Sequence, residues 1–82
     1  VIYAVKYSTD GGKTWKYVQD DQATSTGERP DDTHKIENVT SYILNTPANK
    51  FPIGTYIFMV EAFRGDIPNH YAFHQRRVFI RR

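Results

Sequence analysis

Residues 54–64, GTYIFMVEAFR, form the longest run of strand-favouring residues in the chain. Because successive side chains of an extended chain point to opposite sides, this run has two distinct faces. One face carries four apolar residues: Tyr56, Phe58, Val60 and Ala62. The other face carries one acid among three apolar residues: Ile57, Met59, Glu61 and Phe63. A strand that is apolar on both faces is normally central or covered on both sides. The sequence therefore predicts a central strand that is shielded from water on both faces.

Alternating apolar residues predict further strands near both ends of the chain. Residues 1–8, VIYAVKYS, alternate and read as a strand. Residues 9–13, TDGGK, predict a hairpin turn, and the return strand is 14–19, TWKYVQ. Residues 71–82, YAFHQRRVFIRR, predict a long final strand in which paired arginines flank an apolar core. Charges in these places are a usual protection against edge-to-edge association.

The middle of the chain is less regular. Residues 20–32, DDQATSTGERPDD, predict a loop that is long for a compact domain. We expect a strand over 40–45 and a less regular one over 35–39, since poor helix formers and the lack of a 3.6-residue period disfavour a helix. Residues 47–54 and 65–69 carry turn signals. The predicted core contains eight residues: Tyr3, Val5, Trp15, Leu44, Tyr56, Phe58, Val60 and Ala62.

A chain of 82 residues is long enough for one small domain, 1–82. The absence of cysteine excludes disulfides and thiolate chemistry, and no run approaches the roughly 20 apolar residues that span a bilayer. The net charge of +2 is too small to indicate nucleic acid. Acids concentrate in 20–32 and arginines in 64–82. We interpret these as a solvated loop and a basic strand edge, with a basic binding stripe as the alternative.

The sequence contains no catalytic motif, so we predict no enzymatic activity and no cofactor. His70 and His74 are four residues apart, which on a strand separates their side chains by roughly 13 Å, too far to share one metal ion. The aspartate pairs 20–21 and 31–32 could converge on Ca²⁺, but they lack the spacing of an EF-hand loop, and a solvated acidic loop is the favoured interpretation. We therefore predict no metal site.

Aromatic residues carry the candidate ligand site. Flat sugar faces stack on aromatic rings while polar side chains meet the hydroxyl groups. Because Trp15 is assigned to the core, the candidates are the other rings and nearby polar residues. The predicted ligand-binding set is Tyr17, Tyr42, Tyr71, Phe73, Asn69, His70, His74 and Gln75.

Two stretches together resemble a known family. Residues 3–15 resemble the third strand and hairpin of a fibronectin type III-like or immunoglobulin-like module, and 41–62 resemble its fifth strand, Pro-Gly loop and sixth strand. Tyr56 stands where that family has a tyrosine that hydrogen-bonds upstream backbone. The resemblance implies an all-β sandwich of six to seven antiparallel strands, incomplete at the N-terminus. Two strands that would precede Val1 are then supplied by another chain or segment, or the domain closes differently.

This resemblance implies a non-catalytic binding module of a larger secreted, extracellular or cell-surface protein. The favoured ligand is a polysaccharide or oligosaccharide. The alternative is a structural or adhesion module that binds a protein partner, or assembles with itself, through an open edge or an apolar sheet face. The predicted partner interface on that face is Ile57, Met59 and Phe63.

Overall fold

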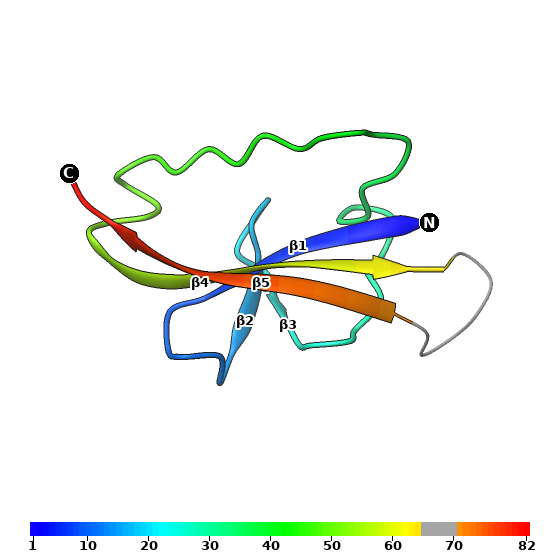
Figure 1. Cartoon of the computed structure of the whole chain (residues 1–82), viewed down its shortest axis with the longest axis horizontal. Helices are drawn as coiled ribbons and strands as arrows, with labels where there is room; N and C mark the ends of the chain where they lie inside the picture. The colour runs from blue at the N-terminus through cyan, green and yellow to red at the C-terminus, as the bar shows by residue number, and fades with distance from the viewer. Residues whose placement is uncertain (65–70) are drawn as a thin grey trace.

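The computed structural model describes residues 1–64 and 71–82, and these residues contain no helix. They form one antiparallel sheet with the order β3-β2-β1-β4-β5 (Figure 1). The strands are β1 (Ile2–Ser8), β2 (Trp15–Tyr17), β3 (Ala23–Thr24), β4 (Gly54–Phe63) and β5 (Tyr71–Ile80). The prediction of an all-β fold is confirmed. The described residues do not form the second sheet of a sandwich.

The strand predicted to be central, β4, lies between β1 and β5. It pairs with β1 from Ile57 to Phe63 and with β5 along its whole length, so the prediction of a central strand is confirmed. The predicted final strand is also present and ends at Ile80. β5 has a neighbour on one side only, so it is one of the two edge strands of the described sheet.

The predicted hairpin joins β1 to β2. Gly11 and Gly12 have φ angles of 77° and 97°, which a side chain would disfavour. The Asp10 carboxylate accepts hydrogen bonds from the Thr14 hydroxyl and backbone at 2.5 and 3.0 Å. These contacts hold the Asp10 pKa well below its usual range. The turn therefore fixes the start of β2, where the Trp15 indole donates to the Gly12 carbonyl at 3.1 Å.

The strands predicted over 35–39 and 40–45 are not formed. Only Ile36 pairs, through an isolated bridge with Tyr3 at the open end of β1. No backbone-to-backbone hydrogen bond joins 37–46 to any other residue that the structure describes, and the Thr46 carbonyl accepts from the Arg82 side chain at 2.7 Å. A strand needs a neighbour with free backbone groups, and the sheet offers one to this segment at Tyr3 alone. The segment 20–32 was predicted to be a loop throughout, but it contains the short strand β3, which pairs with β2.

The sheet has two faces, which we call front and back. Residues that pair across neighbouring strands share a face. The front face carries the odd-numbered residues of β1 and the even-numbered residues of β4, and the back face carries the others. Front-face residues of β1 and β4 are Tyr3, Val5, Tyr7, Tyr56, Phe58, Val60 and Ala62. Back-face residues are Ile2, Ala4, Lys6, Ser8, Ile57, Met59, Glu61 and Phe63.

The back face is closed over β1 and β4. Its apolar residues are buried in two clusters, one around Tyr17 and Phe63 and one around Trp15 and Met59. The loop 25–28 folds over it and binds the buried Lys6 and Glu61 side chains. The predicted partner interface of Ile57, Met59 and Phe63 is therefore wrong, because all three side chains are buried in the chain's own core.

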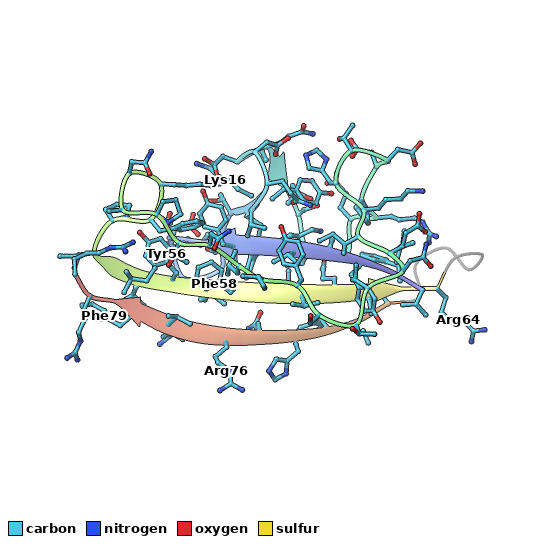
Figure 2. The ribbon with its side chains drawn as sticks, turned by 90° about the horizontal axis from the view of Figure 1, so that it is seen from above. Lys16, Tyr56, Phe58, Arg64, Arg76 and Phe79 are labelled. Carbon is cyan, nitrogen blue, oxygen red and sulfur yellow. The ribbon has the colours of Figure 1, made fainter. Side chains whose placement is uncertain are left out.

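The front face is only partly covered. Segment 36–51 crosses it (Figures 1 and 2), and Phe51 packs with Tyr7 and Tyr56 in the main core cluster. The Tyr56 hydroxyl donates to the Pro52 carbonyl at 2.5 Å, which is the contact that the family resemblance implies. Farther along β4 the cover ends, and Val60 is 44% exposed. The prediction that Val60 belongs to the core is therefore wrong. The prediction that β4 is shielded from water on both faces is wrong at the same residue.

Candidate functional site

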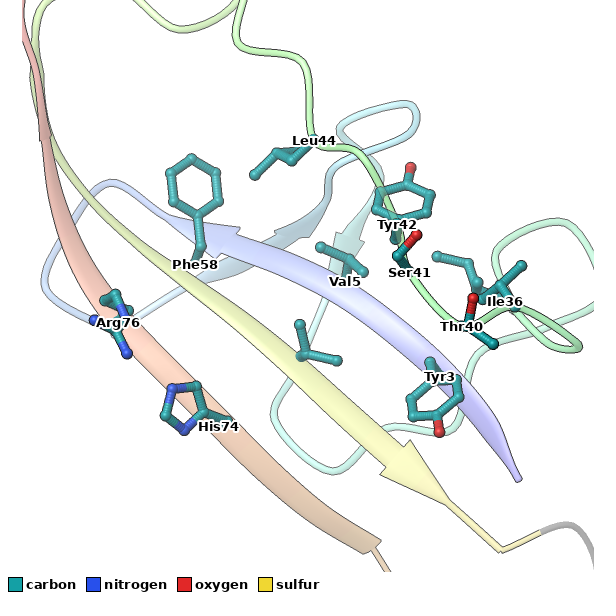
Figure 3. Close-up of a pocket in the computed structure, with 12 residues that line it drawn as sticks. Tyr3, Val5, Ile36, Thr40, Ser41, Tyr42, Leu44, Phe58, His74 and Arg76 are labelled. Atoms are coloured by element: carbon teal, nitrogen blue, oxygen red, sulfur yellow. The ribbon is translucent and has the colours of Figure 1, made fainter.

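A groove of about 430 Å³ opens on the front face where the cover ends (Figure 3). Its floor is apolar and comes from β1 and β4. Segment 36–44 forms one wall, and β5 forms the opposite rim. The floor residues are Tyr3, Val5, Phe58 and Val60; the wall residues are Ile36, Val39, Thr40, Ser41, Tyr42 and Leu44; the rim residues are His74 and Arg76.

The wall of the groove leaves apolar side chains in contact with water. Val39 and Tyr42 are both exposed, as is Ile43 beside them. Leu44 reaches the core cluster at the near end of the groove. Exposed apolar side chains that gather around a concave surface indicate a binding site more often than scattered ones do.

Arg76 gives the rim of the groove a positive charge. His74 pairs with Val60 across the β4–β5 ladder, and Arg76 pairs with Phe58, so both side chains stand on the front face. Figure 3 shows them across the groove from Tyr42 and Leu44. Both rim residues are exposed, and neither forms an ion pair with a residue that the structure describes. The groove therefore combines an apolar floor with an unneutralised positive edge.

The predicted ligand-binding residues do not form one site. Tyr42 and His74 line the groove. Tyr71, Phe73 and Gln75 alternate with His74 along β5 and point to the back side of the sheet. Asn69 and His70 lie outside the described residues.

Tyr17 was expected to be a surface ring, and this prediction is wrong. Its side chain is 2% exposed and stacks on His34, with ring centroids 4.0 Å apart. Burial also raises the pKa of the Tyr17 hydroxyl. Tyr17 therefore belongs to the packing of the back face.

A second surface of aromatic rings lies on the back side of β5. Tyr71 stacks on the buried Phe63 at 5.5 Å, and Phe73 lies 6.2 Å from Tyr71 while remaining 58% exposed. Gln75 follows on the same side of the strand. These residues form a short aromatic surface with a polar neighbour, separate from the groove.

A buried histidine, which sequence reasoning missed, joins two loops. The Nε2 atom of His34 lies 2.7 Å from Asp20, and its Nδ1 atom lies 2.6 Å from Asp31. Burial alone would lower the His34 pKa, but the two carboxylates more than offset this and raise it. The spacing Asp31-x-x-His34 suggests a local contact, whereas nothing in the sequence points to Asp20.

The acidic loop considered for Ca²⁺ is thus engaged with an imidazole. Both ring nitrogens of His34 bind carboxylates, which leaves neither nitrogen for a metal. Among residues 1–64 and 71–82, no group of three or more metal-ligating side chains is placed to hold an ion.

No protein-family model, curated protein or solved structure matches this chain significantly. Within the described part of the chain, no helix is long and apolar enough to cross a membrane. The groove and the aromatic surface of β5 are therefore the candidate functional sites.

Proposed function

We propose that this chain is a non-catalytic interaction module of an extracellular or cell-surface protein, completed by a β-strand from another polypeptide segment. The incoming strand fills the front-face groove. The observation that carries the proposal is the exposure of Val60, at 44%, in the strand that lies between β1 and β5. A central apolar side chain in contact with water favours a second layer on this face.

The wall of the groove supports a strand rather than another type of partner. Residues 37–45 cross the front face with no backbone-to-backbone hydrogen bond to another described residue. Free N–H and C=O groups at such an edge are a template for strand addition. A strand that pairs with 40–45 would direct every second side chain toward Phe58 and Val60. Each aliphatic side chain buried there would contribute about 1.5–3 kcal/mol before the cost of ordering the partner.

This completed arrangement would be an immunoglobulin-like sandwich. The sheet β3-β2-β1-β4-β5 is one layer, and 40–45 together with the incoming strand begin the other. The Tyr56–Pro52 hydrogen bond supports the family resemblance on which this part of the proposal and the extracellular location depend. The strand predicted over 40–45 then forms only when its neighbour arrives.

Amide hydrogen exchange of the whole chain tests this function. The probe is an end-blocked nine-residue peptide of alternating threonine and valine, and the control peptide replaces each valine by serine. We expect the valine peptide to protect the amides of 40–45, and Val60→Lys to abolish that protection. If millimolar valine peptide leaves 40–45 as unprotected as the serine peptide does, the proposal is wrong.

A second candidate function is carbohydrate binding on the back side of β5. The observation that favours it is the exposed pair of Tyr71 and Phe73, with Gln75 beside them to meet hydroxyl groups. Titration with soluble glucans and xylans, followed by the NMR signals of the two rings, tests it. We expect Phe73→Ala to weaken binding, and unchanged ring signals with every polymer would exclude this function.

A further inference from the structure

The positive rim of the groove has no acidic partner among residues 1–64 and 71–82. None of the residues that line the groove is an aspartate or glutamate. Arg76 is exposed beside an apolar floor, and His74 stands two residues away on the same side of β5. A strand that filled the groove with apolar side chains alone would cover part of this rim and leave the guanidinium of Arg76 with less water and no anion. Removing water from an unpaired charge is costly.

A strand from a second copy of this chain does not supply the missing anion. Glu61 is the only acidic residue in the five strands. Its side chain is fully buried and paired with Lys6, so it is not available to a neighbour. A β5 strand from a second copy would bring further arginines to the rim, and like charges side by side are unfavourable. The charges therefore favour a different polypeptide.

We propose that the strand that completes the front face carries a carboxylate side chain at an inward-facing position beside apolar ones, where it pairs with Arg76 and adjoins His74. The partner is thus an amphipathic β-strand with an apolar and acidic inner side. This inference rests on the proposed function, because it specifies the chemistry of the same incoming strand. The apolar floor sets the register, and the rim selects the charge.

Matched peptides separate the charge from the rest of the strand. In the alternating threonine–valine peptide, the third valine is replaced by glutamate or by glutamine, which has nearly the same shape. In a second pair of peptides, the neighbouring threonine is replaced in the same way. Successive residues point to opposite sides, so the second pair places the acid in solvent. A fifth peptide carries glutamate at the inward position but serine in place of every valine.

Binding to the whole chain is measured by fluorescence anisotropy of labelled peptides at low salt. We expect inward glutamate to bind about fivefold more tightly than inward glutamine, which corresponds to an ion pair at a partly exposed site. Outward glutamate and glutamine should bind equally. Arg76→Gln should remove the preference for inward glutamate over inward glutamine, whereas Arg76→Lys should keep most of it. At high salt, the ratio of the affinities of the inward glutamate and inward glutamine peptides should fall toward one.

The possible results separate this inference from the proposed function. If the valine peptides bind and protect 40–45 but glutamate and glutamine bind equally at the inward position, the strand function stands and the carboxylate is wrong. If the serine peptide with glutamate binds as tightly as the valine peptide with glutamate, the surface recognises charge alone and the inference is wrong. If no peptide binds, both proposals are wrong.

Discussion

The ammonium group of Lys6 lies 2.5 Å from Oε1 of Glu61, and neither side chain is exposed to water. The contact is close, although its angle is outside that of a regular hydrogen bond. Lys6 also donates to the carbonyls of Ser25 and Glu28 at 2.7 and 2.9 Å, and the other Glu61 oxygen accepts from Gly27 at 2.6 Å. This pair therefore ties the loop 25–28 to β1 and β4 and closes the back face.

Breaking this pair should destabilise the chain strongly. Lys6→Met leaves the Glu61 carboxylate buried without its cation, and we expect a loss of about 3–5 kcal/mol in the free energy of unfolding. A chain of this size has little stability to lose, so the variant is expected to be largely unfolded near room temperature. Urea unfolding followed by circular dichroism measures the change. Lys16→Met is the matched control, since Lys16 is exposed on β2 and should change stability by less than about 0.5 kcal/mol.

The double variant Lys6→Met with Glu61→Leu should be more stable than Lys6→Met alone, because no buried charge is left unpaired. If the double variant loses the sum of the two single losses, the ion pair is not the reason for the instability.

The contacts of His34 should make stability fall as the pH rises above neutral. The raised His34 pKa means that its contribution is complete below its unfolded value of 6.5 and is lost as the pH rises through the folded value. The lowered pKa values of Asp20 and Asp31 act in the opposite direction. Their contributions are present above 3.8 and are lost as the pH falls through the folded values.

The stability contributed by this cluster is therefore greatest between about pH 4 and 6.5. Urea unfolding at a series of pH values measures it. His34→Gln should be less stable at pH 5 and should lose the decline above neutral pH. A decline of the same slope in this variant would assign the pH dependence to other groups.

The hydroxyl group of Tyr56 should stabilise the fold through its hydrogen bond. Tyr56→Phe removes the donor to the Pro52 carbonyl from a buried position, and we expect a loss of about 1–2 kcal/mol in the free energy of unfolding. Tyr3→Phe provides the control, because its hydroxyl makes no hydrogen bond to another residue that the structure describes. Thermal or urea unfolding of both variants should show a clear difference, and equal losses would contradict this role.

Two neighbouring residues of β4 distinguish the closed face from the open one. Met59 is 1% exposed on the back face, so Met59→Lys should unfold the chain or cost several kcal/mol. Val60→Lys places its charge in the open groove and should cost less than about 1 kcal/mol, while it abolishes strand binding. Size-exclusion chromatography and urea unfolding of the two variants make the comparison. A Met59→Lys variant as stable as Val60→Lys would reverse the assignment of the faces.

Sequence pattern predicted the strands more reliably than it predicted their surroundings. The alternation in 54–63 fixes which side chains share a face, and the sheet confirms the extended chain. It does not say which face the rest of the chain covers. That choice depends on contacts such as Lys6 with Ser25 and Gly27 with Glu61, which are 19 and 34 residues apart in the chain. The partner interface was consequently assigned to the wrong face.

The segment 40–45 shows a second limit. Its composition favours an extended chain, but a strand also requires a neighbour with free hydrogen-bonding groups, and local composition carries no information about that neighbour. The prediction of Tyr17 as a surface ring was wrong for a related reason. Tyr17 and Tyr42 look alike in sequence, yet Tyr17 is held under His34 whereas Tyr42 stands on the groove wall.

The position of the tryptophan decides which optical signal can follow the groove. Trp15, the only tryptophan in the chain, packs with Ile57 and Met59 on the back face. The sheet itself lies between its indole and the groove, so indole emission will report loss of the fold and stay unchanged when the groove is filled. Tyr42 and Tyr3, which line the groove, are the native chromophores that sense an occupant there.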